Sequence, residues 1–115
     1  MKQLYIGNKN YSSWSLRPWV LMQTLGISFE EVLMPFDGPD NYHRYKVFSP
    51  NGRVPCLQDG DQVVWDSLAI MEYLAESHPQ VWPQEVAART YARSACSEMH
   101  AGFETLRAQC PMICA

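Results

Sequence analysis

The sequence of 115 residues lacks a long hydrophobic run, a basic tract and a leader of charged and then apolar residues. Because a helix that spans a bilayer needs ~20 consecutive apolar residues, we expect no membrane partner. A net charge of −3 without a cluster of Lys or Arg argues against nucleic acid as a partner. Since the N-terminus shows no export signal, we expect a cytoplasmic protein.

Cysteine pairs at metal-ligand spacing are also missing. Cys56, Cys96, Cys110 and Cys114 form no C-x-x-C pair, so we expect reduced thiols and no metal site. The histidines at positions 43, 78 and 100 are scattered and show no evident carboxylate or cysteine companions. We interpret all three histidines as surface residues.

Hydrophobic residues make up 47% of the chain and charged residues 18%, a balance typical of a globular protein. Apolar alternation and periodicity predict strands and helices in a fixed order. The order is strand 2–7, helix 15–25, strand 29–34, an irregular connection over 36–50 with one short helix, strands 54–58 and 62–65, and helix 67–77. Gly26 is the expected stop of the first helix.

This order of elements predicts an α/β domain over residues 1–80. A helix between the first two strands implies a parallel pair with a right-handed crossover. Asp59-Gly60-Asp61 is a hairpin signal that adds an antiparallel pair, giving a mixed four-stranded sheet. Trp65 is expected in its core.

Residues 84–115 show a different pattern. A continuous helix is expected over 84–108, with apolar residues at steps of three and four on one face. These residues are Ala88, Ala92, Ala95, Met99, Phe103 and Leu106. Because no later segment can cover this stripe, it must meet a second subunit, the first domain or polypeptide that is absent. We interpret the chain as a truncated two-domain protein, with residues 84–115 as the first helix of an all-helical second domain.

The Val54-Pro55 step and the Asp66-Ser67 pair are candidate binding features. A trans bond is the common state before proline, whereas a cis bond would turn the Val54 backbone outward to pair with an extended peptide. Either Asp66 or Ser67 can cap the predicted helix, and the two residues could also hold an ammonium and a carboxylate, respectively. Capping alone and capping with binding both remain open. Arg53 is either a solvated side chain or a partner for a ligand carboxylate.

The serines before the first helix are the third candidate feature. Since Pro18 lacks an N–H, we expect it within the first turn, which makes Ser15 the N-cap and leaves Ser12 and Ser13 in the preceding loop. A hydroxyl at the positive end of a helix can donate a hydrogen bond to a thiolate. The same serines could equally do no more than form a turn.

Three motifs together resemble the glutathione S-transferase superfamily, most closely a zeta-like bacterial cytosolic branch. They are Ser-Ser-x-Ser-x-Arg (12–17), Ser-Pro-Asn-Gly-Arg-Val-Pro-x-Leu (49–57) and Asp-Ser-x-Ala-Ile-x-x-Tyr-Leu (66–74). The resemblance implies a thioredoxin-like first domain and glutathione as co-substrate.

The resemblance also implies a role for each candidate residue. Pro55 would follow a cis bond, and the Val54 backbone would pair with the cysteinyl unit of glutathione. Asp66 and Ser67 would hold the γ-glutamyl end, and Arg53 would face the glycyl carboxylate. The family's thiolate-stabilising residue lies five positions before the helix arginine, which assigns that role to Ser12.

The function implied is a glutathione transferase of detoxification type, which conjugates glutathione to a small-molecule electrophile and forms a homodimer. A non-catalytic module that binds glutathione or a protein is the alternative, as is a glutathione-dependent isomerase. Trp14 stands where the zeta branch has a cysteine, which argues against maleylacetoacetate isomerisation.

Overall fold

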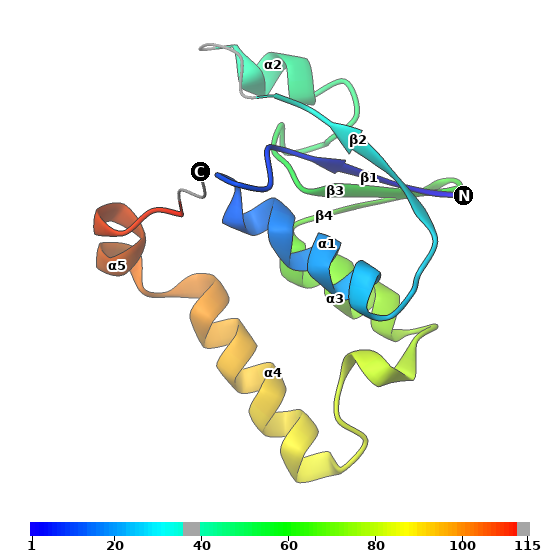
Figure 1. Ribbon diagram of the computed structural model, residues 1–115. Helices are drawn as coiled ribbons and strands as arrows, with labels where there is room; N and C mark the ends of the chain where they lie inside the picture. Colours follow the sequence, from blue (N-terminus) through cyan, green and yellow to red (C-terminus); the bar gives the residue numbers. More distant parts are fainter. Residues whose placement is uncertain (36–39, 113–115) are drawn as a thin grey trace.

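The computed structural model describes residues 1–35 and 40–112. Its centre is a four-stranded sheet in the order β2-β1-β3-β4 (Figure 1). The strands are β1 (Lys2–Ile6), β2 (Phe29–Leu33), β3 (Cys56–Asp59) and β4 (Gln62–Trp65). β1 runs parallel to β2 and antiparallel to β3, and β3 and β4 are antiparallel. The predicted mixed sheet is confirmed, in the thioredoxin-like arrangement that the resemblance implies.

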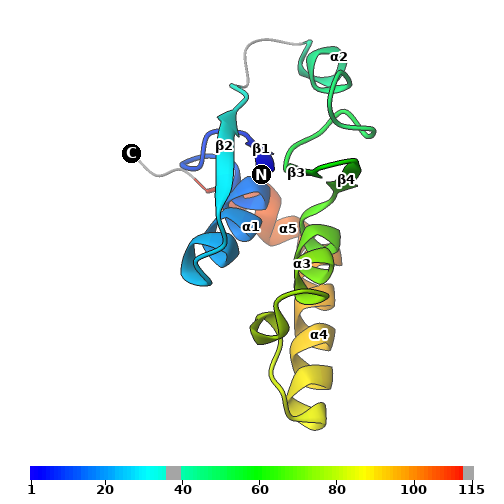
Figure 2. The same ribbon diagram turned by 90° about the vertical axis from the view of Figure 1, so that its right-hand side faces the viewer.

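Two helices cover one face of this sheet. α1 (Ser13–Thr24) and α3 (Ser67–Ala75) pack against each other, whereas the short α2 (Asn41–Tyr45) lies on the other side of the sheet (Figures 1 and 2). Between the sheet and the two helices lies the hydrophobic core, made of Leu4, Ile6, Met22, Ile27, Leu57, Ile70 and Leu74. The part of the predicted connection at residues 36–39 lies outside the described residues.

α1 begins earlier than predicted, and Ser12 takes the capping role that was predicted for Ser15. Ser12 is the N-cap, and its Oγ accepts the Ser15 backbone N–H at 3.3 Å. Ser15 is fully buried, and its Oγ accepts the Gly7 N–H at 3.0 Å and the Ser12 hydroxyl at 2.9 Å. Pro18 therefore lies inside the helix rather than in its first turn. Its ring is fully buried, and this packing offsets the loss of one backbone hydrogen bond.

The end of α1 agrees with the prediction. Gly26 adopts φ 69°, and its N–H donates to the carbonyl of Gln23 while the Ile27 N–H donates to that of Met22. This is a Schellman motif, for which glycine is favoured because it has no Cβ. Met22 and Ile27 then meet in the core.

One expectation about burial was wrong. Trp65 is 44% exposed, because β4 is the edge strand and this side chain lies outside the core cluster.

Cys56 opens β3 and is fully buried. Burial raises the pKa of its thiol, and a hydrogen bond with Ser49 lowers it by less. The thiol therefore stays protonated at neutral pH. Cys56, Cys96 and Cys110 are free thiols, and Cys114 lies outside the described residues.

The last segment is not one continuous helix. A short 3₁₀ helix (Pro79–Val81) leads to α4 (Val86–Ala101), and α5 (Glu104–Gln109) follows after a break. Phe103 has φ 62°, and a side chain at Gly102 would approach the Glu98 carbonyl to 3.0 Å. The break arises because glycine is a poor helix former and the next residue adopts the left-handed conformation.

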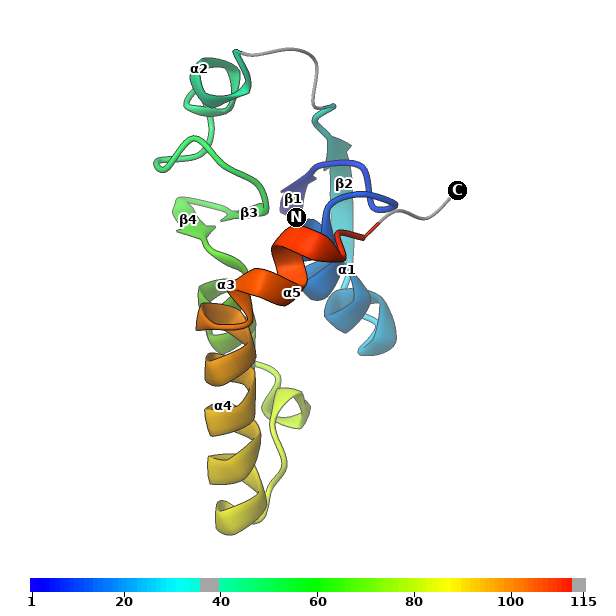
Figure 3. The same cartoon turned by 90° about the vertical axis from the view of Figure 1, so that its left-hand side faces the viewer.

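α4 extends away from the sheet and contains no buried residue (Figure 3). The break divides the predicted apolar stripe between α4 and α5, and its large side chains stay open, since Met99, Phe103 and Leu106 are 41%, 50% and 52% exposed. In the described part of the chain, no helix is both long enough and apolar enough to cross a bilayer.

We predict that Ser15→Ala destabilises the protein by ~1–3 kcal/mol, because the buried Gly7 N–H loses its acceptor. Urea unfolding measures the change. Ser13→Ala is the matched control, because no hydrogen bond of its half-buried hydroxyl is found among the described residues, and we expect less than about 0.5 kcal/mol. Equal effects of the two substitutions would contradict the assignment of Ser15.

We also predict that Cys56 does not react with a thiol reagent in the native protein at pH ~8, because the group is buried and its pKa is raised. Native Cys56→Ser and wild-type proteins should show the same number of reactive thiols. After unfolding, the wild-type protein should show one more. A loss of one reactive thiol from the native variant would contradict the prediction.

Candidate functional site

A cavity of about 300 Å³ lies where the loop before β3, the start of α3, the first turn of α1 and the end of α4 meet. Its lining residues are Trp14, Asn51, Arg53, Val54, Pro55, Asp66, Ser67 and His100. All the predicted site residues except Ser12 therefore line one cavity. Trp14, Asn51 and His100 are additions that the sequence reasoning did not place there.

The loop before β3 is held in a fixed shape. Asn51 Oδ1 accepts hydrogen bonds from the Ser49 hydroxyl at 2.9 Å and the Arg53 N–H at 3.1 Å. Gly52 has φ 68°, and a side chain there would meet the Tyr42 ring at 2.5 Å, so this position requires glycine. The Val54–Pro55 bond is cis, the geometry that the resemblance implies.

Two groups of this loop are available to a ligand. Among the described residues, no hydrogen bond uses the backbone N–H or carbonyl of Val54. The exposed Arg53 side chain forms no ion pair within the same residues. The cavity wall therefore offers a strand-like edge and one positive charge.

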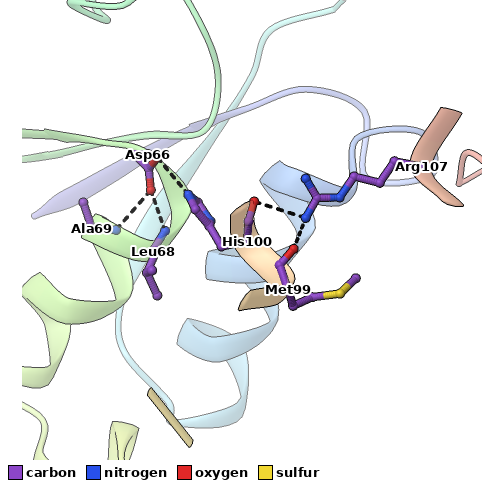
Figure 4. Close-up of polar contacts among 6 residues, drawn as sticks. All are labelled: Asp66, Leu68, Ala69, Met99, His100 and Arg107. Atoms are coloured by element: carbon purple, nitrogen blue, oxygen red, sulfur yellow. Dashed lines mark hydrogen bonds and ion pairs between the residues drawn. The ribbon is translucent and has the colours of Figure 1, made fainter. Parts of the chain in front are cut away.

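Asp66 joins β4 directly to α3 and adopts φ 79°. Its Oδ1 caps α3 by accepting the N–H groups of Leu68 at 2.9 Å and Ala69 at 3.3 Å (Figure 4). Its Oδ2 lies 3.1 Å from Nε2 of His100. The predicted capping role is confirmed, and the contact with His100 is new.

Ser67 is the first residue of α3 and is 2% exposed. Its Oγ is buried and has no hydrogen-bond partner among the described residues. An unpaired buried hydroxyl is costly unless a ligand satisfies it. Since it also lies at the positive end of a helix, the group suits a carboxylate.

Ser12 is placed differently from the prediction. It caps α1, is only 8% exposed and does not line the cavity, although Trp14 of the same helix does. The argument that left Ser12 free in a loop was therefore wrong, because Ser15 turns inward to bind Gly7 and Ser12 takes the capping position.

His100 comes from α4, 34 residues after Asp66 in the chain. Its ring packs edge-on against Trp14 with centroids 5.0 Å apart, and Trp14 also lies beneath Arg17 and Arg107. Burial, and then the charge of Arg107, lower the pKa of Arg17. No local motif marks His100, because its position depends on the path of the chain between α3 and α4.

Considering only the described residues, the cavity presents the Asp66 carboxylate, the unpaired Ser67 hydroxyl beside a helix N-terminus, the Arg53 cation and the unused backbone groups of Val54. Together these groups suit a peptide-like zwitterion. No cluster of three metal-binding side chains is present within residues 1–35 and 40–112.

Comparison with known proteins places this cavity in context. "Probable maleylacetoacetate isomerase" of Caenorhabditis elegans is 28% identical over 90% of this chain and 48% of its own length. "Glutathione S-transferase 1" of Dianthus caryophyllus is 30% identical over 91% of this chain and 48% of its own. The theta class glutathione S-transferase of Xanthomonas axonopodis pv. citri, solved with glutathione bound, is 28% identical with a TM-score of 0.76, covering 93% of this chain and 52% of that one.

The chain thus spans about half the length of the curated relatives it matches. A family model, the N-terminal domain of glutathione S-transferase, matches residues 11–77. This match includes the start of α1, the loop before β3 and all of α3, which carry most of the cavity. It covers more than half of the sequence, and we conclude that the chain belongs to the glutathione S-transferase N-terminal domain family.

Proposed function

We propose that this chain binds glutathione in the cavity at the start of α3 and acts as the first domain of a glutathione transferase. The observation that carries the proposal is the buried, unpaired Ser67 hydroxyl beside the Asp66 carboxylate. One group suits a carboxylate and the other an ammonium, which is the pair of charges at the γ-glutamyl end of glutathione.

The remaining groups of the cavity suit the rest of the tripeptide. The Val54 N–H and carbonyl would pair with the cysteinyl unit as an added strand. Arg53 would bind the glycyl carboxylate. This orientation directs the thiol toward the first turn of α1, where Trp14 borders the cavity.

For the chemical step, we propose that Ser12 stabilises the glutathione thiolate. The Ser12 hydroxyl donates to Ser15 Oγ in the structure. The direction of this hydrogen bond can reverse, so that the Ser15 hydroxyl donates to Ser12 Oγ. Ser12 is then free to donate to sulfur. A charge-assisted hydrogen bond of ~1.5–3 kcal/mol would lower the thiol pKa by about one to two units. Once the thiol proton has passed to water, the thiolate sulfur forms a carbon–sulfur bond with an electrophilic carbon. The electron pair of the bond that breaks there leaves with a departing anion or, in an addition, moves onto the acceptor, which then takes up a proton from water.

An isomerase is the second candidate, favoured by the similarity to the Caenorhabditis elegans protein. Trp14 argues against it, because this side chain stands where the zeta branch carries a cysteine. A module that binds glutathione without catalysis is the third candidate, and it is distinguished by the thiol titration described below.

We further propose that residues 84–115 begin an all-helical second domain. An apolar hollow of about 570 Å³ lies between α1, α3 and α4, and further helices would fill it. The exposed apolar residues of α4 and α5 would then pack against that domain or against a second copy in a cytoplasmic homodimer.

We predict that Ser67→Ala weakens glutathione binding by about 10- to 100-fold, because the ligand carboxylate loses a charge-assisted hydrogen bond. Isothermal titration calorimetry on the full chain measures the dissociation constant. Ser77→Ala, just beyond the far end of α3, is the control and should leave affinity unchanged. Equal affinity for the Ser67→Ala and wild-type proteins would refute the proposed carboxylate subsite.

We predict that bound glutathione ionises one to two pH units below free glutathione, and that Ser12→Ala removes this shift. Thiolate ultraviolet absorbance followed against pH gives the midpoint. Ser13→Ala is the control and should keep the shift. Loss of the shift in Ser13→Ala instead would reassign the donor, and no shift in wild type would leave a glutathione-binding module without this catalytic step.

A further inference from the structure

Both oxygens of the Asp66 carboxylate are already engaged. Oδ1 accepts the two backbone N–H groups that cap α3, and Oδ2 lies 3.1 Å from Nε2 of His100 (Figure 4). The Oδ1 contacts belong to the helix and cannot be given up without uncapping it. A ligand ammonium must therefore approach Oδ2, where His100 lies.

His100 is held in this position by two other segments. The Trp14 ring of α1 packs against the imidazole, and Arg107 of α5 donates to the His100 backbone carbonyl at 3.1 Å. The side chain is 24% exposed, compared with 45% for that of Asp66. Packing and a backbone hydrogen bond therefore hold His100 beside Asp66. The contact between His43 and Asp40 differs, because both side chains are exposed and Nε2 of His43 lies 3.9 Å from Oδ1 of Asp40.

Resting on the proposed glutathione site, we propose that His100 is a positioning residue that controls access of the ligand's ammonium to Asp66. When the imidazole is protonated, it binds Oδ2 as a cation and repels a second positive charge. When it is neutral, its Nε2–H tautomer can still orient the carboxylate, without the repulsion. The ligand's ammonium group therefore competes with protonated His100 for Oδ2 of Asp66.

Near neutral pH, the other charged groups on the segments that meet at this contact are of residue types that do not ordinarily titrate. Arg53 lines the cavity, Arg17 of α1 and Arg107 of α5 flank Trp14, and Glu72 of α3 is paired with Arg93 of α4. Arginine stays protonated throughout this range. Histidine is the side chain that ordinarily changes charge there.

The sign of the pH effect follows from this competition. The α-amino group of glutathione stays protonated between pH ~5.5 and ~7.5, whereas histidine is the residue type that ordinarily changes charge over this range. Affinity for a ligand with a free amino group should therefore rise with pH. Full competition by a group that loses most of its charge over this range gives a change of about tenfold.

The test uses S-hexylglutathione, because its blocked sulfur removes the titration of the thiol. Its dissociation constant from the full chain is measured by calorimetry at pH ~5.5 and ~7.5, with circular dichroism checking that the chain is equally folded at both. We expect about tenfold tighter binding at the higher pH for wild type. His100→Gln, which keeps a hydrogen-bond donor without a titrating charge, should change less than about twofold. His43→Gln is the matched control and should behave as wild type.

A second ligand keeps the test valid if His100→Gln does not fold. N-acetylated S-hexylglutathione has no ammonium, so its affinity for wild type should not rise with pH. Three results would each overturn the role of His100 and leave the glutathione site standing. They are a pH-independent affinity of wild type for S-hexylglutathione, an equal rise for the acetylated ligand, and a rise that persists in His100→Gln. Failure of S-hexylglutathione to bind at either pH would overturn the glutathione site, and this inference with it.

Discussion

The site depends on one backbone constraint, the positive φ of Asp66 between β4 and α3. β4 ends at Trp65 and α3 begins at Ser67, so a single residue makes the turn. A non-glycine residue at φ 79° costs on the order of 1–3 kcal/mol, and the two hydrogen bonds from its carboxylate to the helix offset this cost. The same turn leaves the Ser67 hydroxyl buried without a partner in the part of the chain that the structure describes, and it directs the second carboxylate oxygen toward α4.

At the start of α1, two serine side chains accept hydrogen bonds from backbone N–H groups. Ser15 satisfies the buried Gly7 N–H at the end of β1, and Ser12 satisfies the N–H of Ser15. The N-terminal ends of α1 and α3 both border the cavity, through Trp14 and Ser67. Two positive helix ends at one cavity favour negative charge, which agrees with a ligand that carries two carboxylates and an ionisable thiol.

α4 adds a residue to the cavity from outside the sheet and the two helices that cover it. Its side chains are largely exposed, yet His100 reaches Asp66 and Trp14. The break at Gly102 lets α5 fold back so that Arg107 can bind the carbonyl of His100. The site is thus built by the thioredoxin-like sheet and helices together with one residue of the helical segment.

Local patterns in the sequence determined most of the elements and most of the residues that line the cavity. Alternation and periodicity gave the strands and the mixed sheet, Gly26 gave the end of α1, and the motifs marked Arg53, Val54, Pro55, Asp66 and Ser67, because each of these depends on neighbours close in the chain. Tertiary structure alone decided that Ser12 rather than Ser15 caps α1, since this depends on which hydroxyl accepts the Gly7 N–H. It also decided the exposure of Trp65 at the sheet edge and the arrival of His100 at Asp66. Such contacts join residues far apart in sequence, and their geometry exists only once the intervening chain has folded.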